Sequence, residues 1–307
     1  MKTFVHIGFP KSASTFLQKK IFSKNGHINY IKDPSFYEYL YAKKKVSEKI
    51  RKRFIDNFIK KEFSTSKINI ISAEIFVMPN DCLFTHPRDN DWKKILPNKE
   101  IMQNLKSLPI DYEIIMIIRN QRSWLISWYQ ERVKRLETKS FQNWLGSKEI
   151  KNTLKVIDFY ETLKLWKKFF IKRKISIIPF ELLKNDSEKF IKEISKILGV
   201  KINIDDKSIV KSGISKRAIF FKRKINILGG ILVTLFGKKS LIYLYFSRAN
   251  KKIMGLDFLL SKLFKGRVYH SLNSKLASHY ESKNKLLDRH LKLDLERYNY
   301  FDLNSKD

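Results

Sequence analysis

The stretch that most constrains how this chain can fold lies close to its N-terminus, at residues 3–18, and reads TFVHIGFPKSASTFLQ. An apolar run ends in Gly8-Phe9-Pro10, a turn of small and hydroxyl-bearing residues follows, and an amphipathic run begins at Phe16. A strand, a tight turn and a helix in this order form a cradle for an anion, because the first turn of a helix presents free backbone N–H groups and a partial positive charge. The stretch therefore predicts an anion-binding loop between a first strand and a first helix.

The side chains of this turn suit the same kind of ligand. Lys11 brings a full positive charge, and Ser12, Ser14 and Thr15 bring hydroxyl donors. The same side chains could instead only cap the helix, and the turn alone does not separate the two interpretations. The turn does not match the G-x-x-x-x-G-K-[ST] pattern of triphosphate-binding loops, because Lys11 precedes the small residues and no second glycine follows it.

Strand-like and helix-like segments alternate over residues 1–200. Compact apolar runs predict further strands at Ser66–Ala73, Asp111–Ile118 and Lys174–Phe180. Helical spacing predicts helices at Phe16–Phe22, within Tyr37–Phe63, and at Ile101–Ser107, Arg122–Leu136, Phe141–Leu145, Asp158–Ile171 and Ser187–Leu198, with a loop at Met78–Pro97. This alternation predicts an α/β fold with a central parallel sheet covered on both faces, that is, three layers.

Beyond Val210 the pattern changes. Residues 216–264 are basic and hydrophobic without clear strands, and a last helix is expected at Leu276–Leu295. No repeat or low-complexity linker divides the chain, so we expect one domain over residues 1–307, with an α/β core at 1–210 and a mainly helical cap at 211–307. The most apolar stretch, Ile225–Phe236, is shorter than the roughly 20 residues of a membrane-spanning helix.

The charge balance favours anionic partners. The chain has 63 Lys and Arg against 30 Asp and Glu, a formal net charge of +33. Such an excess suits anionic substrates, cofactors or surfaces, but codon bias in an AT-rich genome would also produce it, and both explanations stay open. The single cysteine, Cys82, excludes an intrachain disulfide and a multi-cysteine metal site. With no signal peptide evident, we expect a cytoplasmic protein, of bacterial type.

The turn after the first strand resembles the phosphosulfate loop of sulfotransferases, whose pattern P-K-[ST]-G-[ST]-[ST] aligns with residues 10–15, PKSAST. The resemblance implies that the donor is 3′-phosphoadenosine 5′-phosphosulfate and the product adenosine 3′,5′-bisphosphate. It implies that residues 11–16, Lys11, Ser12, Ala13, Ser14, Thr15 and Phe16, bind the donor, and that Lys11 stabilises the leaving oxygen. Ala13 departs from the family pattern, which usually has glycine there. Alanine fits only if its backbone keeps a negative φ or tolerates strain.

A second match supports the resemblance. Sulfotransferases bind the 3′-phosphate of the donor with an arginine at a strand end and a serine eight positions on, and here Arg119 and Ser127 have that spacing. An arginine at the carboxyl end of a strand lies at the sheet edge where open α/β folds bind ligands. Gln121 stands where the family often has proline. Alone, Arg119 could be a salt-bridge partner and Ser127 a surface residue, but the two motifs occur in the right order.

Weaker matches extend the resemblance to bacterial carbohydrate-type sulfotransferases. They are Phe159–Phe169, the segment KISIIPFELL at 174–183, and Ser282–Leu287, and we interpret all three as core packing. By analogy with these relatives, the adenine pocket is expected near residues 211–217. The resemblance implies a P-loop-type sulfotransferase fold with a helical C-terminal elaboration.

The general base is the least determined part of the site. Glu74 follows the strand Ser66–Ala73 at the expected ligand edge and is the leading candidate to take the proton of an acceptor hydroxyl, with His86 as the alternative. Glu74 could equally be the partner of a lysine or arginine. His6 is expected to pack against a neighbour, and no cluster at metal spacing is present, so no metal is expected.

These residues suffice for transfer of a sulfuryl group to a hydroxyl or amine. The resemblance implies a carbohydrate as the acceptor, and the positive charge of the chain allows this carbohydrate to be anionic. Such a transfer mainly requires positioning and charge stabilisation. We expect no nucleic-acid partner, and the sequence does not indicate an oligomeric state. Two alternatives remain: a P-loop kinase using ATP, and a non-catalytic protein that binds polyanions.

Overall fold

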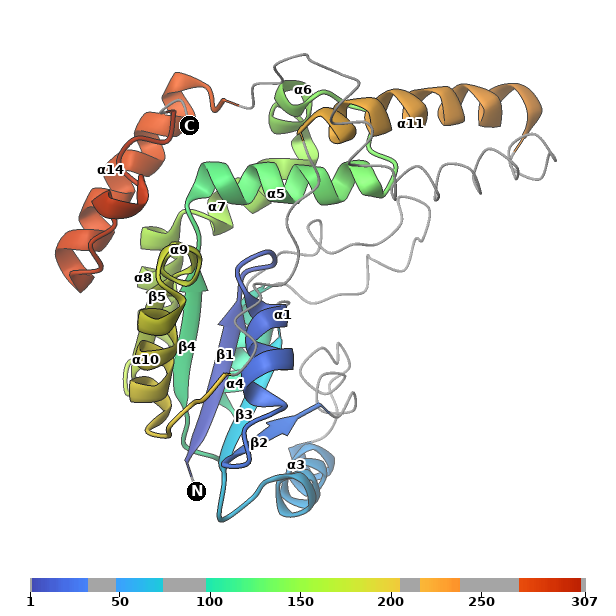
Figure 1. Cartoon of the computed structure of the whole chain (residues 1–307). Helices are drawn as coiled ribbons and strands as arrows, with labels where there is room; N and C mark the ends of the chain where they lie inside the picture. Colours follow the sequence, from blue (N-terminus) through green and yellow to red (C-terminus); the bar gives the residue numbers. More distant parts are fainter. Residues whose placement is uncertain (1, 33–47, 74–97, 205–215, 238–270, 305–307) are drawn as a thin grey trace. The chain divides into compact units, whose positions relative to one another are not determined.

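A computed structural model describes residues 2–32, 48–73, 98–204, 216–237 and 271–304 of the chain (Figure 1). The chain divides into two compact units. The first comprises Met1–Gln121, Glu149–Val210 and Asn273–Asp307, and the second comprises Arg122–Lys148 and Lys211–Leu272. Each is described separately below, and the single domain expected from the sequence stays a prediction.

The first unit is built on a five-stranded sheet in the order β2-β3-β1-β4-β5. The strands are β1 (Thr3–Gly8), β2 (Ile28–Ile31), β3 (Ile68–Ala73), β4 (Glu113–Ile118) and β5 (Ile175–Pro179). All four neighbouring pairs are parallel, so every carboxyl end lies at one edge of the sheet. β1 is central, and its residue Ile7 pairs with Ala73 on one side and Met116 on the other. The parallel α/β fold predicted from the alternating pattern is confirmed.

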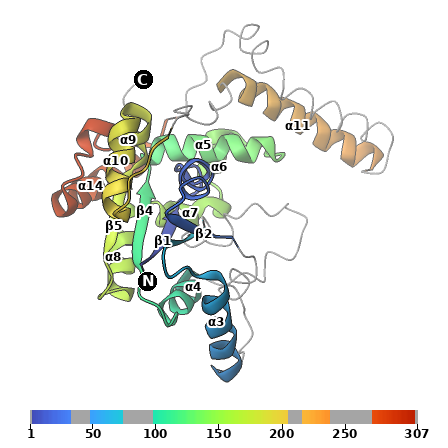
Figure 2. The same cartoon turned by 60° about the horizontal axis from the view of Figure 1, so that its bottom comes forward.

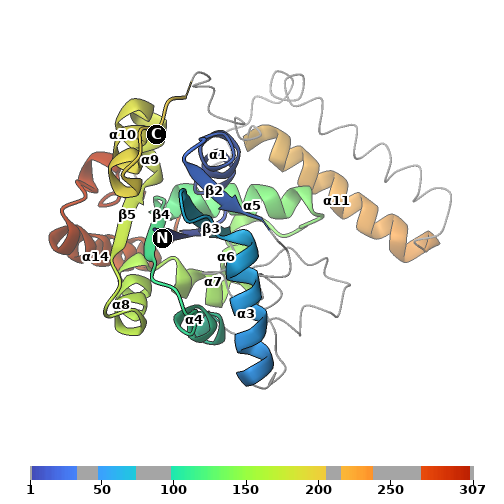
Figure 3. The ribbon, with the colours of Figure 1, turned by 90° about the horizontal axis from the view of Figure 1, so that it is seen from below.

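Helices cover both faces of this sheet. The described helices of the first unit are α1 (Ser14–Phe16) with the π-helical η1 (Leu17–Phe22), α3 (Glu48–Glu62), α4 (Asn98–Lys106), η5 (Lys148–Ile150) at its border, α7 (Lys151–Val156), α8 (Phe159–Phe169), α9 (Phe180–Asn185), α10 (Ser187–Leu198), α14 (Ser274–Leu291) and η7 (Glu296–Tyr298). Seen from below, α1 and α10 lie on one face and α4 and α8 on the other (Figure 3). On the first face, the rings of Phe16 and Phe190 meet edge to face, with centroids 6.4 Å apart.

The core follows the pattern expected of a sheet covered on both sides. Every residue of β1 is buried, as are five of the six in β4, and these strands read as continuous rather than alternating apolar runs. α14 lies beside α8, outside the layer that covers the sheet (Figure 2). The C-terminal helix is therefore part of the first unit.

The second unit contains α5 (Gln121–Lys134, with Gln121 at the border), α6 (Phe141–Leu145) and α11 (Lys216–Phe236). Its core is aromatic: the indoles of Trp124 and Trp128 stack at 5.3 Å, and Tyr129 packs against Phe141 and Trp144. α11 is anchored by Asn226, whose amide donates to the carbonyls of Val133 at 2.7 Å and Glu137 at 3.0 Å. Among the described residues, no helix is both long and apolar enough to cross a membrane.

Most predicted elements occur within a few residues of their expected bounds. The structure adds β2, α7 and α9, which the sequence did not predict, and it extends the first helix back to Ser14. The predicted loop at 78–97 and the stretch after residue 237 up to 264 lie outside the described residues.

Candidate functional site

The turn after β1 has a left-handed backbone at two residues that are not glycine. Lys11 has φ 65° and Ala13 has φ 63°. Of the two conformations that the sequence left open for Ala13, the structure shows the strained one, which costs roughly 1 kcal/mol for an L-residue. Gly8 is required for a different reason: a Cβ there would lie 2.1 Å from Ser14 Oγ. The turn thus folds back tightly onto the end of β1.

Two hydroxyls in this turn are buried without a hydrogen bond. Ser12 and Ser14 are 0% and 2% exposed, and within the described part of the chain neither Oγ has a partner. An unsatisfied buried hydroxyl costs about 1–3 kcal/mol. Oxygen atoms of an anion in the turn could remove this cost, so the pair fits a phosphate or sulfate group.

The other residues of the turn differ in exposure. Lys11 and Ala13 are half-buried, Thr15 is exposed and Phe16 is 5% exposed. The ring of Phe16 packs on Phe190, so Phe16 anchors the turn to α10 in this structure. Its predicted contact with the donor stays a prediction.

Arg119, directly after β4, contacts this turn. Its Nη1 donates to the carbonyl oxygen of Lys11 at 2.6 Å, and its guanidinium lies 4.6 Å from the ring centre of Phe180. Burial lowers the pKa of Arg119, while the nearby charge of Glu181 raises it. The guanidinium therefore holds the backbone of the residue whose ammonium group is the candidate catalytic charge.

Glu181, at the start of α9, organises the backbone beside Arg119. Its Oε1 accepts the N–H of Asn120 at 3.0 Å and its Oε2 accepts the hydroxyl of Tyr300 at 2.8 Å. Burial raises the pKa of this carboxyl, and the hydroxyl of Tyr300, the N–H of Asn120 and the charge of Arg119 lower it. The side-chain amide of Asn120 also donates to the carbonyl of Asn299 at 2.9 Å. The C-terminal segment thus lies against the residues that follow β4.

A second polar pair fixes the same segment. Gln121 and Asn284 exchange two amide hydrogen bonds of 2.8 and 2.9 Å, and Asn284 also donates to the carbonyl of Tyr300 at 2.9 Å. Gln121 further donates to Ile157 O at 3.3 Å. Proline, which the family often has at position 121, could not form these bonds. Gln121 therefore connects the end of β4 to α14.

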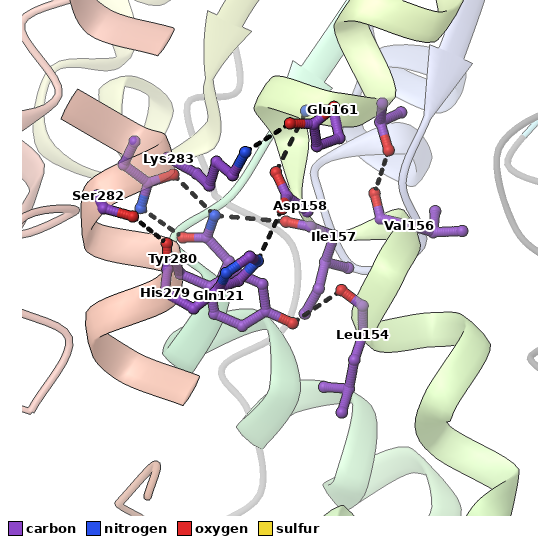
Figure 4. A network of polar contacts seen from close by, with 12 residues as sticks. Gln121, Leu154, Val156, Ile157, Asp158, Glu161, His279, Tyr280, Ser282 and Lys283 are labelled. Atoms are coloured by element: carbon purple, nitrogen blue, oxygen red, sulfur yellow. Dashed lines mark hydrogen bonds and ion pairs between the residues drawn. The ribbon is translucent and has the colours of Figure 1, made fainter. Parts of the chain in front are cut away.

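More ionic and hydroxyl contacts join α14 to α7 and α8 (Figure 4). His279 Nε2 lies 2.8 Å from Asp158 Oδ2, Lys283 Nζ lies 2.5 Å from Glu161 Oε1, and the hydroxyl of Tyr280 donates to the carbonyl of Leu154 at 2.8 Å. Asp158 is also the N-cap of α8, since its Oδ1 accepts Glu161 N.

His6 lies under the turn, as a packed residue. It is fully buried, its Nδ1 is 2.7 Å from Ser72 Oγ and its ring meets Phe22 edge to face at 5.7 Å. Gln18 donates to the same Ser72 Oγ at 3.0 Å. Burial lowers the pKa of His6 to about 3, so the imidazole is neutral near neutral pH. The expectation that His6 packs against a neighbour is confirmed.

The remaining predicted site residues lie either in the second unit or outside the described residues. Ser127 is half-buried on α5 in the second unit, so its pairing with Arg119 stays a prediction. Glu74, which follows the last residue of β3, and His86 lie outside the described residues, as do residues 211–215 of the predicted adenine pocket. Within the described ranges no three His, Cys, Asp or Glu side chains are grouped to hold a metal.

Sequence reasoning missed Glu181, Asn284 and Tyr300. Glu181 and Asn284 lie in segments that the sequence analysis interpreted as core packing. That interpretation is correct for Trp166, which is 2% exposed and stacked on Phe170, but it overlooked the hydrogen bonds of these two polar side chains. The available signal for Glu181 was a glutamate at the end of the apolar segment 174–180, because a charged residue next to a sheet core needs a partner.

A parallel sheet with a tight turn after its central strand, two buried hydroxyls in that turn and a half-buried arginine after the next strand is typical of α/β proteins of the phosphate-loop class. The chain belongs to the sulfotransferase family, because the family model described as the sulfotransferase domain matches residues 2–224. It is therefore a transferase that moves sulfuryl groups.

Two solved sulfotransferase structures are similar to this chain. One from Alicyclobacillus acidocaldarius is 14% identical with a TM-score of 0.46, over 76% of this chain and 96% of that one. Mouse sulfotransferase SULT7A1 complexed with PAP is 16% identical with a TM-score of 0.35, over 74% of this chain and 66% of that one. A search among curated proteins gave no match.

Proposed function

We propose that this sulfotransferase uses 3′-phosphoadenosine 5′-phosphosulfate as its donor and transfers the sulfuryl group to a hydroxyl or amine of a carbohydrate. The observation that carries the donor assignment is the turn itself. The buried hydroxyls of Ser12 and Ser14 have no hydrogen-bond partner within the described residues, and Arg119 holds the backbone carbonyl of Lys11 in the same turn. A ligand with two separated anionic groups suits a turn and a half-buried arginine at adjacent strand ends, whereas a triphosphate needs only the turn.

The proposed roles follow from the chemistry of an in-line displacement. A new bond forms between the acceptor oxygen or nitrogen and sulfur, and the bond between sulfur and the bridging phosphate oxygen breaks. The hydroxyls of residues 12, 14 and 15 orient the phosphosulfate, and Lys11 stabilises the charge on the leaving oxygen. Arg119 and Ser127 hold the 3′-phosphate, and Glu74, or alternatively His86, takes the acceptor proton. No metal takes part in this scheme.

The donor assignment is tested by ligand binding. Adenosine 3′,5′-bisphosphate should raise the melting temperature of the full chain more than ATP with Mg²⁺ does, because it has a second phosphate for Arg119. A larger shift with ATP and Mg²⁺ would favour a kinase, and no shift with either ligand would favour a polyanion-binding protein.

The roles of the two cations are tested by substitution. Lys11→Ala should keep measurable affinity for adenosine 3′,5′-bisphosphate but lower kcat about 100-fold or more, as does removing one stabilising donor elsewhere. Arg119→Ala should weaken that affinity and also lower kcat, because the guanidinium holds the Lys11 carbonyl. Lys19→Ala, an exposed lysine on η1, is the matched control and should change neither. Normal turnover of Lys11→Ala would refute the role of Lys11.

The acceptor class needs its own screen. Transfer of radiolabelled sulfate to glycans, phenols and lipids compares the acceptors directly. Transfer to phenols but not to glycans would overturn the carbohydrate assignment and leave the donor assignment intact.

A further inference from the structure

The helix α11 exposes apolar side chains on its outward face. Of the nine large hydrophobic residues that are exposed in the described part of the chain, six lie on this one helix. They are Phe220, Ile227, Leu228, Ile231, Leu235 and Phe236, with exposed fractions from 37% to 68%. Four of the six, at positions 220, 227, 231 and 235, follow the spacing of a single helical stripe. A stripe of this kind normally faces a protein core.

The opposite face of α11 is the one that packs within the second unit. Ala218, Ile219, Lys222, Ile225 and Asn226 are buried there, and the Asn226 amide donates to the carbonyls at the end of α5. This inward face already contains apolar side chains and also buries Lys222 and Asn226, so the exposed apolar stripe is a second apolar surface of the same helix. Ile227, Gly230, Ile231, Thr234 and Leu235 also line a shallow hollow with Thr138.

The charge of this part of the sequence is more one-sided than that of the whole chain. Residues 216–267 contain thirteen Lys or Arg and one Asp, whereas the complete chain has 63 against 30. Codon bias would raise the lysine content throughout and does not explain a local loss of acidic residues. On α11 itself, the cations Arg223 and Lys224 lie beside the exposed ring of Phe220, at 5.4 and 5.6 Å from its centre.

We propose that α11 docks this sulfotransferase on an anionic lipid surface. The apolar stripe enters the boundary between headgroups and acyl chains, and Arg223 and Lys224, beside the stripe residue Phe220, contact lipid phosphates. A nucleic acid or an acidic glycan would satisfy the positive charge but would leave the stripe in water. A neutral protein partner would cover the stripe but would not use the charge. Only a surface that is both apolar and anionic matches both observations.

The test is co-flotation of the full chain with lipid vesicles. The chain should bind phosphatidylcholine vesicles with about 30% phosphatidylglycerol and bind vesicles of phosphatidylcholine alone at least about tenfold more weakly. The double variant Ile231→Ser/Leu235→Ser should bind the anionic vesicles about tenfold more weakly than the wild type, because both side chains are already exposed and their loss removes only the inserted area. The double variant should keep its melting temperature.

The control is Ile171→Ser, which replaces an 80% exposed isoleucine of the first unit and should bind vesicles like the wild type. Three results would overturn the proposal: no binding to anionic vesicles, binding that the double serine variant leaves unchanged, or a concentration-dependent dimer that the double variant abolishes. The second would mean that the net charge alone adsorbs the chain, and the third that a second copy covers the stripe. A large fall in melting temperature would place the stripe inside the fold and would overturn it as well.

Discussion

Replacing Tyr300 by phenylalanine removes one hydroxyl from the polar contacts behind Arg119. The hydroxyl donates to the half-buried carboxylate of Glu181 at 2.8 Å, and the Tyr300 side chain is fully buried, so the phenylalanine ring leaves no donor in place of the lost hydroxyl. A hydrogen bond to a charged group contributes about 1.5–3 kcal/mol. For a unit of this size such a loss lowers the melting temperature by about 5 °C.

The effect should depend on pH in a definite direction. Burial raises the pKa of the Glu181 carboxyl and the Tyr300 hydroxyl opposes this, so Tyr300→Phe raises that pKa further. A carboxyl whose pKa is raised on folding destabilises the folded state at high pH, and the cost is relieved as the pH falls through the raised pKa toward the unfolded value. The difference in melting temperature between wild type and Tyr300→Phe should therefore be larger near pH 7.5 than near pH 5.

Tyr112→Phe is the matched control for this measurement. Tyr112 is also buried, and its hydroxyl donates to the carbonyl of Leu105 at 2.8 Å, an uncharged acceptor. Its loss should lower the melting temperature by about 2–4 °C, equally at both pH values. A Tyr300→Phe difference that is the same at both pH values would refute the argument that the hydroxyl stabilises a charged Glu181. Tyr300→Phe should also weaken binding of adenosine 3′,5′-bisphosphate if the carboxylate positions Arg119, and Tyr112→Phe should not.

Two further predictions concern the turn and the residue beneath it. Ala13→Gly relieves the left-handed alanine at φ 63° and should raise the melting temperature by about 2–4 °C, whereas Ala218→Gly within α11 should lower it, as differential scanning calorimetry would show. An Ala13→Gly variant that melts lower would mean that the strain is not stored at this residue. The pKa of His6 is lowered to about 3 by burial, so protonation of the unfolded chain costs stability as the pH falls below about 6.5. His6→Gln should lose less stability than the wild type between about pH 6.5 and about pH 4 in chemical denaturation, and equal losses would contradict the buried neutral imidazole.

The fold could be predicted largely from the sequence because four of the five strands of the sheet are unambiguous. β1, β3, β4 and β5 are compact apolar runs, and runs of this kind between helical segments leave few topologies other than a parallel sheet. β2 was missed because it is a short edge strand, INYI, in which Asn29 and Tyr30 are only half-buried. β5 is an edge strand as well but reads ISIIP, so the short length and the two polar-bearing residues of β2, rather than its edge position, hide it in the sequence.

Only part of the candidate site could be predicted from the sequence. The turn and Arg119 form a local pattern with fixed spacing, so a sequence reader can find them. The hydrogen bond between Tyr300 and Glu181 joins residues 119 positions apart, and that between Gln121 and Asn284 joins residues 163 positions apart. No periodicity or spacing in the sequence indicates such pairs. The sequence left two backbone conformations open for Ala13, and the folded structure shows the strained one, with a positive φ.

The hydrogen bond from Arg119 to the Lys11 carbonyl has a consequence for how the proposed site works. Nη1 of the guanidinium donates to the loop backbone at 2.6 Å, and a guanidinium carries its other N–H donors on the same rigid plane. An anion that binds those donors pulls on the same rigid group that holds Lys11 at φ 65°. The 3′-phosphate of the proposed donor would thereby help to set the position of the lysine that acts at the other end of the donor. A donor analogue without this phosphate should then lose kcat as well as affinity, whereas two independent subsites would lose affinity alone.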